Sequence, residues 1–444
     1  MDAFSCKRAS EEDVIGPMAW TAGLAALAGA LACATSTTAQ IGPLTTPRLP
    51  GLPSGVTDRL PDVGRVQGLA GRAVDEAVQA PSRLTGLVRR SRGALEADPL
   101  GWPVVSGEIV ALDLSDEARR EAMDDGYHVL RDERLEALDL TTTVLAPPRR
   151  LSLARAVERL QALDPGAEIT FNHVHAPAGA IEGRTSSAPA VSAPQRGGAR
   201  LGLIDTGVDA AHPALTGSRI IQRGFAGTAR IGAHGTAVAS LMVGRSGAFS
   251  GGAPGADLLV ADIYGGQATG GASTTLAQAL AWMLEQRATV VNVSLVGPRN
   301  SLVERAIARA QAEGVIVVAA VGNDGPAAPP LYPAAYAGVV GVTGVSGRNQ
   351  VLPEAARGAH VDFAAPGADM AAAGSGGGWT SVRGTSFAAP IVAGLLAMRG
   401  QSALESQATD LGERGRDPVY GTGLVGTAAR VAPSAVGARR RLRP

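Results

Sequence analysis

Cysteine is nearly absent from this 444-residue chain: the only two, Cys6 and Cys33, fall in its first tenth. The globular part that follows therefore contains no disulfide and no thiol nucleophile, and its stability must come from packing. Lysine is scarcer still, since Lys7 is the only one and all other basic residues are arginine. We interpret this bias as the coding preference of a GC-rich genome rather than as phosphate recognition.

The chain also lacks a net charge, because 40 basic and 40 acidic residues balance. No overall field exists to attract nucleic acid or an anionic membrane, and we expect no nucleic-acid partner. Hydrophobic residues make up 45% of the chain, which excludes a wholly disordered protein. The balance hides an asymmetry: residues 101–176 hold 14 acids and 8 bases, whereas residues 200–444 hold 15 acids and 20 bases. Two regions of opposite sign are thus able to dock.

The first hundred residues indicate export followed by a linker. Residues 14–34 are uncharged and are followed by small residues to position 40, which is typical of a cleaved signal peptide. A membrane anchor through residues 14–34 stays open as the alternative, as does a start at Met18. We therefore expect a secreted or periplasmic protein. Residues 41–100 contain many Pro and Gly residues and no sustained apolar periodicity, which predicts a linker of low order, although residues 74–90 could form a helix.

Residues 101–176 have the element order strand, helix, strand, strand, helix, strand. Ser115 and Ser152 each precede a helical pattern and are candidate N-caps. The order βαββαβ predicts a small α+β module of the ferredoxin-like type. Residues 177–199 are rich in Ala, Pro and Ser and predict a flexible linker at a domain boundary.

From residue 200 onward, apolar strands alternate with helices. The predicted strands are 201–204, 258–261, 290–293, 315–320 and 339–342, and the predicted helices are 234–243, 274–285 and 301–313. This alternation indicates an α/β fold with a parallel sheet covered by helices on both faces, extending over residues 200–431. Residues 432–444 predict a basic tail.

Three motifs in this second region carry the residue types of nucleophilic catalysis. Asp205-Thr206-Gly207 places an acid at the end of a buried strand. An aspartic protease would need two such motifs or a homodimer, and this chain has one copy. His234-Gly235-Thr236 places a histidine at the start of a helix. Gly384-Thr385-Ser386 places a serine at a helix N-terminus, where free backbone N–H groups are able to stabilise an oxyanion.

The chain order Asp, His, Ser is that of the subtilisin-type triad, and the sequence resembles the subtilisin-like serine proteases (subtilases). Further stretches that resemble the family are Gly252-Ala253-Pro254-Gly255-Ala256, Ala319-Ala320-Val321-Gly322-Asn323, Ala365-Pro366-Gly367 and Gly421-Thr422-Gly423. The resemblance covers residues 200–431 and implies a subtilisin-like fold and serine endopeptidase activity on protein or peptide substrates. It implies Ser386 as the nucleophile, His234 as the general base and acid, and Asp205 as the group that orients the imidazole.

The same resemblance implies an oxyanion donor and a specificity pocket. Asn323 would donate its side-chain amide to the oxyanion. The segments that resemble the walls of the primary specificity pocket are Ser294, Leu295, Val296 and Gly297 on one side and Ala320, Val321 and Gly322 on the other. Because these walls are largely apolar, we expect a hydrophobic residue before the scissile bond.

In subtilases a βαββαβ module ahead of the catalytic domain acts as chaperone and inhibitor, so residues 101–176 are expected to be an inhibitory prodomain of a zymogen. Pro177 would impede cleavage after Ala176, which places processing within residues 178–200. His173 and His175 alternate on a strand, but two ligands make no metal site, and we predict no metal site at them. No cofactor is expected, a structural calcium is not indicated, and a monomer is expected.

Two alternatives stay open. The chain could be a catalytically silent subtilase fold that serves as a binding or scaffold protein. It could also be a cell-surface maturation protease with one dedicated substrate. Hydrolysis of a generic peptide panel separates them: the first would cleave nothing and the second only a very narrow set.

Overall fold

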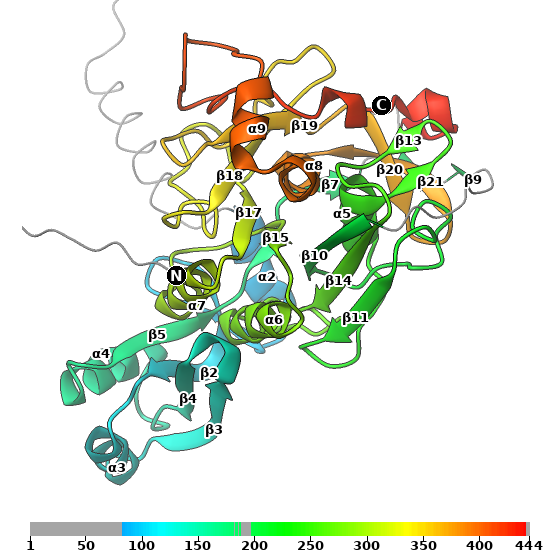
Figure 1. Cartoon of the computed structure of the whole chain (residues 1–444). Coiled ribbons are helices and arrows are strands. Elements are labelled where there is room, and N and C mark those ends of the chain that lie inside the picture. Colours follow the sequence, from blue (N-terminus) through cyan, green and yellow to red (C-terminus); the bar gives the residue numbers. More distant parts are fainter. Residues whose placement is uncertain (1–81, 182, 185, 188–196, 441–444) are drawn as a thin grey trace, which may run out of the picture. The chain divides into compact units, whose positions relative to one another are not determined.

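The structure is a computed structural model that describes residues 82–181, 183–184, 186–187 and 197–440 (Figure 1). The predicted signal or anchor lies outside these residues, as do residues 41–81 and the end of the predicted tail. All described residues belong to one compact unit. We call residues 82–173 the N-terminal module and residues 197–440 the C-terminal region.

A seven-stranded parallel sheet forms the centre of the C-terminal region, in the order β11-β14-β10-β15-β17-β18-β19. Its strands are β10 (Gly197–Asp205), β11 (Ile220–Gly224), β14 (Ala256–Asp262), β15 (Val290–Val293), β17 (Ile316–Ala320), β18 (Val340–Val345) and β19 (Phe363–Pro366). Helices α5 (Ala233–Val243) and α8 (Thr385–Arg399) share one apolar cluster with the sheet, and α6 (Ser273–Glu285) and α7 (Ser301–Ala312) share the other. The predicted α/β fold is therefore confirmed, with two additional strands, β11 and β19.

The N-terminal module is an antiparallel sheet whose main strands lie in the order β5-β2-β4-β3, with β1 paired to the start of β2. Its elements are α2 (Ser82–Arg90), β1 (Leu95–Ala97), β2 (Pro103–Leu112), α3 (Asp116–Asp124), β3 (His128–Leu135), η2 (Glu136–Leu138), β4 (Leu140–Ala146), α4 (Leu153–Leu163) and β5 (Glu168–His173). Ser115 caps α3 and Ser152 caps α4, each accepting a hydrogen bond from the N–H three residues later. The element order is the predicted βαββαβ.

Two predicted boundaries are wrong at the start of the module and after it. Residues 82–97, predicted to be linker, contain α2, which lies within the stretch 74–90 expected as a possible helix, and β1, which was not expected; Leu84 and Leu95 are buried. Part of the predicted flexible linker is also ordered: β6 (Ala176–Pro177) pairs with β16 (Leu295–Val296), and β7 (Ala180–Ile181) pairs with β21 (Gly378–Arg383). These stretches have little apolar period of their own, so pairing and packing with other segments must order them.

The predicted C-terminal tail is ordered in part as well. It contains η4 (Pro433–Val436) and β22 (Arg439–Arg440), and β22 pairs with β8 (Gly183–Arg184). The remaining elements are β9 (Ser186–Ser187), β12 (Arg245–Ser246), β13 (Phe249–Ser250), β20 (Met370–Gly374), α9 (Gln401–Gln407) and η3 (Thr427–Ala429). Within the described residues no single helix is long and apolar enough to cross a membrane; α8 and α9 meet that criterion only together, as a pair bent by 116°.

Both faces of the module's sheet are buried, because side chains alternate along each strand. On one face Ile109 packs with Leu160 of α4. On the other face Val110 and Leu112 share an apolar cluster with Leu280 of α6. In Figure 1, α6 and α7 accordingly lie between the two sheets, and they contribute to the cores of both.

Candidate active site

Three side chains from distant parts of the sequence form one hydrogen-bonded chain at the carboxyl edge of the parallel sheet. Asp205, the last residue of β10, is fully buried, and its two carboxylate oxygens lie 2.8 and 3.0 Å from His234 Nδ1. His234 Nε2 lies 3.1 Å from Ser386 Oγ. The structure thus brings together the three residues that the sequence predicts as acid, base and nucleophile.

Local backbone geometry fixes each of these groups. His234 and Ser386 both lie in the first turn of a helix, α5 and α8. The hydroxyl of Thr206 accepts a hydrogen bond from Gly235 N–H at 3.0 Å, which ties the end of β10 to the start of α5. Gly384, which precedes α8, has a φ of 136°, a conformation that only glycine adopts without strain.

The arrangement is suited to proton transfer. The carboxylate of Asp205 selects the tautomer with hydrogen on Nδ1, which leaves Nε2 as the acceptor that faces Ser386 Oγ. The His234 side chain is 11% exposed, and the ring of Phe387 packs against it with centroids 5.2 Å apart. The carboxylate and the aromatic ring thus fix the imidazole in place, with Nε2 directed at Ser386 Oγ.

Asn323 lies beside the nucleophile. Its Oδ1 accepts a hydrogen bond from Thr385 N–H at 3.0 Å, which orients the amide. Its Nδ2 is buried and has no hydrogen-bond partner among the described residues. The N–H of Ser386 lies in the first turn of α8, where a helix offers no partner of its own. Two donors are thus available to a developing oxyanion.

The residues predicted to wall the specificity pocket separate into two groups. The side chains of Val296 and Ala320 lie in the apolar cluster that contains Ala178. Those of Leu295 and Val321 belong to the cluster on the opposite face of the sheet, so their side chains do not form the predicted wall. Side chains alternate between the two faces of a strand, and the motif alone did not show to which face Leu295 and Val321 belong.

Ser294 and Gly322, also predicted as pocket residues, each donate a hydrogen bond to the first turn of α8. The carbonyl of Ser294 accepts a hydrogen bond from Ala178 N–H at 3.2 Å, and its hydroxyl donates to the Ser386 carbonyl at 2.9 Å. A Cβ placed on Gly322 would lie 2.5 Å from Leu331 Cδ1. Leu331 was not singled out from the sequence, and its fully buried side chain takes up space behind Gly322.

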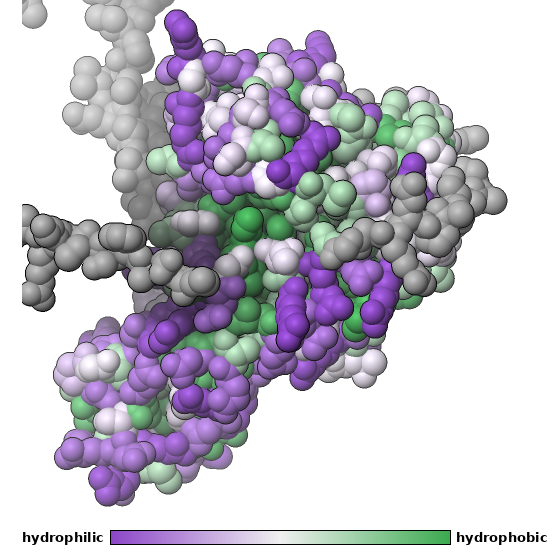
Figure 2. Space-filling model, in the orientation of Figure 1, coloured by the Kyte–Doolittle hydropathy of each residue, from purple (hydrophilic) through white to green (hydrophobic). Residues whose placement is uncertain are grey.

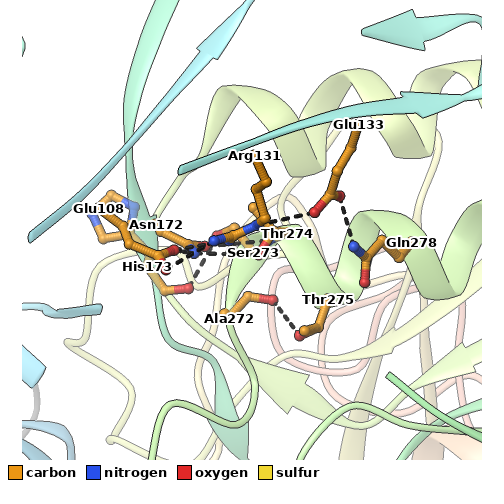
Figure 3. Close-up of polar contacts among 10 residues, drawn as sticks. All are labelled: Glu108, Arg131, Glu133, Asn172, His173, Ala272, Ser273, Thr274, Thr275 and Gln278. Carbon is orange, nitrogen blue, oxygen red and sulfur yellow. Dashed lines mark hydrogen bonds and ion pairs between the residues drawn. The ribbon is translucent and has the colours of Figure 1, made fainter. Parts of the chain in front are cut away.

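The module meets α6 through a polar network that Figure 3 shows. Ala272 precedes α6 and offers no capping side chain. Instead, Asn172 of β5 accepts a hydrogen bond from Thr274 N–H at 3.2 Å and donates to Glu108 at 2.7 Å. Burial alone raises the pKa of Glu108, but hydrogen bonds from Arg131 and Asn172 outweigh burial and lower it. The module therefore supplies the N-cap that α6 lacks.

A second contact joins β5 to α7. Asn300 caps α7, and its Nδ2 donates to the Phe171 carbonyl at 2.9 Å and lies 3.0 Å from His173 Nδ1. His173 Nε2 in turn lies 3.2 Å from Asp98. His173 thus takes part in a polar network at the interface, and no group of three His, Cys, Asp or Glu side chains in the described part of the chain could hold a metal ion.

Comparison with known proteins identifies the family. A model of the subtilase family matches residues 196–411. Subtilisin Savinase from Lederbergia lenta is 32% identical over 275 residues, covering 58% of this chain and 96% of the relative. Thermitase from Thermoactinomyces vulgaris is 31% identical over 245 residues, covering 53% and 86%. The chain belongs to the subtilase family and is a serine endopeptidase.

Two further relatives extend the comparison. The minor extracellular protease Epr from Bacillus subtilis is 30% identical over 219 residues, which cover 46% of this chain and 34% of that protein. Among solved structures, fervidolysin from Fervidobacterium pennivorans, a keratinolytic enzyme related to subtilisin, matches with a TM-score of 0.61 at 20% identity. The match covers 73% of this chain and 60% of that one and shows that the fold is subtilisin-like.

Proposed function

We propose that this subtilase cleaves peptide bonds through Asp205, His234 and Ser386, with Asn323 as the oxyanion donor, and that it is made as a secreted zymogen. The hydrogen-bonded chain from carboxylate to imidazole to hydroxyl is the observation that carries the proposal. Secretion rests on the uncharged run of residues 14–34 and on the extracellular relative described above.

In this mechanism Ser386 Oγ attacks the carbonyl carbon of the substrate while His234 Nε2 takes its proton. The oxyanion that forms accepts hydrogen bonds from Asn323 Nδ2 and from the N–H of Ser386. His234 then gives the proton to the leaving amine, and water hydrolyses the acyl-enzyme by the same route. Asp205 holds the imidazole and stabilises its cationic form.

The N-terminal module acts as the intramolecular inhibitor in this proposal. Its sheet packs on α6 and α7, and its last strand continues directly into residues 174–178 beside β16. A substrate cannot use the same backbone groups while that segment occupies them. The module therefore inhibits because residues 174–178 compete with substrate for the backbone groups of β16.

The test is the substitution Ser386→Ala. We expect hydrolysis of a generic peptide panel to be lost and the chain to accumulate as the uncut precursor. Ser246→Ala is the matched control, since Ser246 is equally buried and its hydroxyl has no hydrogen-bond partner among the described residues. Normal hydrolysis by Ser386→Ala would contradict the proposal, and an inactive wild-type chain would favour the scaffold alternative.

A further inference from the structure

The segment that follows the module runs through the active site as an added strand. On one side, His175 N–H donates to the Gly271 carbonyl at 2.8 Å. On the other side, β6 pairs with β16 in the register Ala176 with Val296. Ala178 N–H then donates to the Ser294 carbonyl at 3.2 Å. Backbone pairing on both edges is the way in which an extended peptide is held by a sheet.

The pairing continues beyond the nucleophile. β7 pairs with β21, with Ala180 opposite Arg383 and Ile181 opposite Val382. The chain is therefore held on both sides of Ser386, with Ala178 and Gly179 between the two paired stretches. This is the arrangement of a bound substrate that has not been cut.

Close contacts identify the bond that faces the nucleophile. A Cβ placed on Gly179 would overlap Ser386 Oγ, so Gly179 lies directly against the hydroxyl. A Cβ placed on Gly384 would lie 3.1 Å from the carbonyl oxygen of Ala178 and 3.2 Å from Asn323 Nδ2. The carbonyl oxygen of Ala178 and the unpartnered amide of Asn323 thus lie in the same corner of the site.

We infer that the bond this enzyme cuts in its own chain to separate module from C-terminal region is Ala178–Gly179. The inference rests on the proposed function and names its first substrate. It agrees with the position of Pro177, which would hinder cleavage after Ala176.

The step balances as an ordinary acyl transfer. Ser386 Oγ bonds to the carbonyl carbon of Ala178, and its proton moves to His234 Nε2. The bond from that carbon to the nitrogen of Gly179 breaks, and the nitrogen takes the proton from His234 and leaves as a free amine. Water then adds to the ester, with His234 again carrying the proton, which releases Ala178 with a carboxylate and restores Ser386.

The side chains around the bond indicate which sequences the groove accepts. Ala178 is fully buried in the same apolar cluster as Leu331, so the position before the cut suits a small residue. This narrows the hydrophobic residue expected from the sequence to a small one. Three residues earlier, the ring of His175 lies against Gly297, where a Cβ would come within 2.5 Å of its Cδ2. The groove therefore combines a small subsite with one that takes a planar ring.

The experiment follows the full-length chain as it refolds from denaturant, with samples quenched over time and analysed by intact mass. We expect the earliest two fragments to end at Ala178 and to begin at Gly179. Their rate of formation should not change on tenfold dilution, because the bond is already seated in the site of its own molecule. Earliest fragments that end at any other residue would overturn the inference.

Variants test the position independently. Ala178→Glu places a charge in a buried apolar subsite and should slow self-cleavage by more than the roughly 10- to 200-fold that a single methylene costs in a hydrophobic pocket, whereas Ala178→Ser should cut at the same bond. Ala180→Glu, at an exposed position two residues on, should slow it far less. Equal rates for Ala178→Glu and Ala180→Glu would contradict the assignment.

Hydrolysis of an added peptide containing His-Ala-Pro-Ala, the sequence of residues 175–178, separates the two claims. If the peptide is cut while the chain is processed elsewhere, only the assignment of Ala178–Gly179 fails. If neither the peptide panel nor the chain is cut, the proposed function fails as well.

Discussion

The two sheets of this protein differ in which part of the chain supplies the helices that pack on their faces. In the C-terminal region the helices on both faces of the seven-stranded sheet follow its own strands in sequence. The module has helices of its own for only one face, and α6 and α7 of the other region cover the second. The C-terminal region is thus self-contained in its layers, whereas the second face of the module's sheet is covered only when the module is docked.

Because of this difference, separate sets of residues determine the stability of the module and its inhibition of the enzyme. Residues on the module's inner face, toward α3 and α4, hold the module itself together, while residues on its outer face hold it to the enzyme. In the space-filling view of Figure 2, polar residues cover much of the visible surface of the module, since its second apolar face is buried against α6 and α7. A pair of matched substitutions should therefore affect the two properties differently.

The largest expected effect comes from Leu112→Ala compared with Leu145→Ala. Both leucines are fully buried in strands of the module, but Leu112 clusters with α6 and α7 whereas Leu145 clusters with α3 and α4. Each truncation should cost about 2–5 kcal/mol. In Leu112→Ala the loss should appear as weaker docking, measured as the inhibition constant of the cleaved module. Equal effects of the two variants on the stability of the isolated module would contradict this division.

The next effect concerns the C-terminal region alone. Asn323→Ala should lower kcat by about 10² to 10³, the loss known for an oxyanion donor in a subtilisin, with little change in KM. Asn323→Asp keeps an acceptor for Thr385 N–H and removes the donor, so it should lose a similar amount. Steady-state kinetics of the processed enzyme measure both, and an unchanged kcat in Asn323→Ala would remove this residue from the mechanism.

Docking should also depend on pH through His175. Burial, reinforced by the nearby charge of His173, lowers the pKa of His175 from 6.5 to about 4. The docked module thus holds this imidazole neutral, and the free module takes up a proton as the pH falls below 6.5. Docking should therefore be about 30-fold weaker at pH 5 than at pH 8, and the loss should level off near pH 4.

His175→Phe provides the control for this prediction. Its ring fills similar space and does not titrate, while His173, Asp98 and Tyr264 around it stay unchanged. The inhibition constant of this variant should lose most of its dependence on pH between 5 and 8. A dependence equal to that of the wild type would contradict the assignment of this effect to His175.

The smallest effect is expected from surface charge. Arg305 of α7 pairs with Asp113 of the module at 2.6 Å, but both side chains are partly exposed, and such pairs contribute about 0–1 kcal/mol. Arg305→Ala should weaken docking by less than about tenfold, and added salt should have a similarly small effect. Arg299→Ala, which breaks a pair inside the C-terminal region, should leave docking unchanged. A large salt dependence would mean that charge, rather than the apolar face, drives docking.

The sequence allowed prediction of those parts whose structure depends on a local pattern of residues. Apolar runs predicted five strands of the parallel sheet, and short motifs predicted Asp205, His234 and Ser386, which the structure brings into one chain of hydrogen bonds. It could not predict the order of residues 177–181, because an Ala-, Pro- and Gly-rich stretch has no period of its own and gains its structure from β16 and β21. The role of Leu331 was not predicted for a related reason, since only the fold brings its side chain into contact with Gly322.

The most direct test of this account measures access to Ser386. A fluorophosphonate labels the processed enzyme, and two forms of the module are added as competitors: residues 82–178, and residues 82–173, which lack the segment that lies in the groove. We predict that the longer form protects Ser386 and that the shorter form binds but leaves the labelling rate nearly unchanged. Equal protection by both forms would contradict the claim that residues 174–178 occupy the active site.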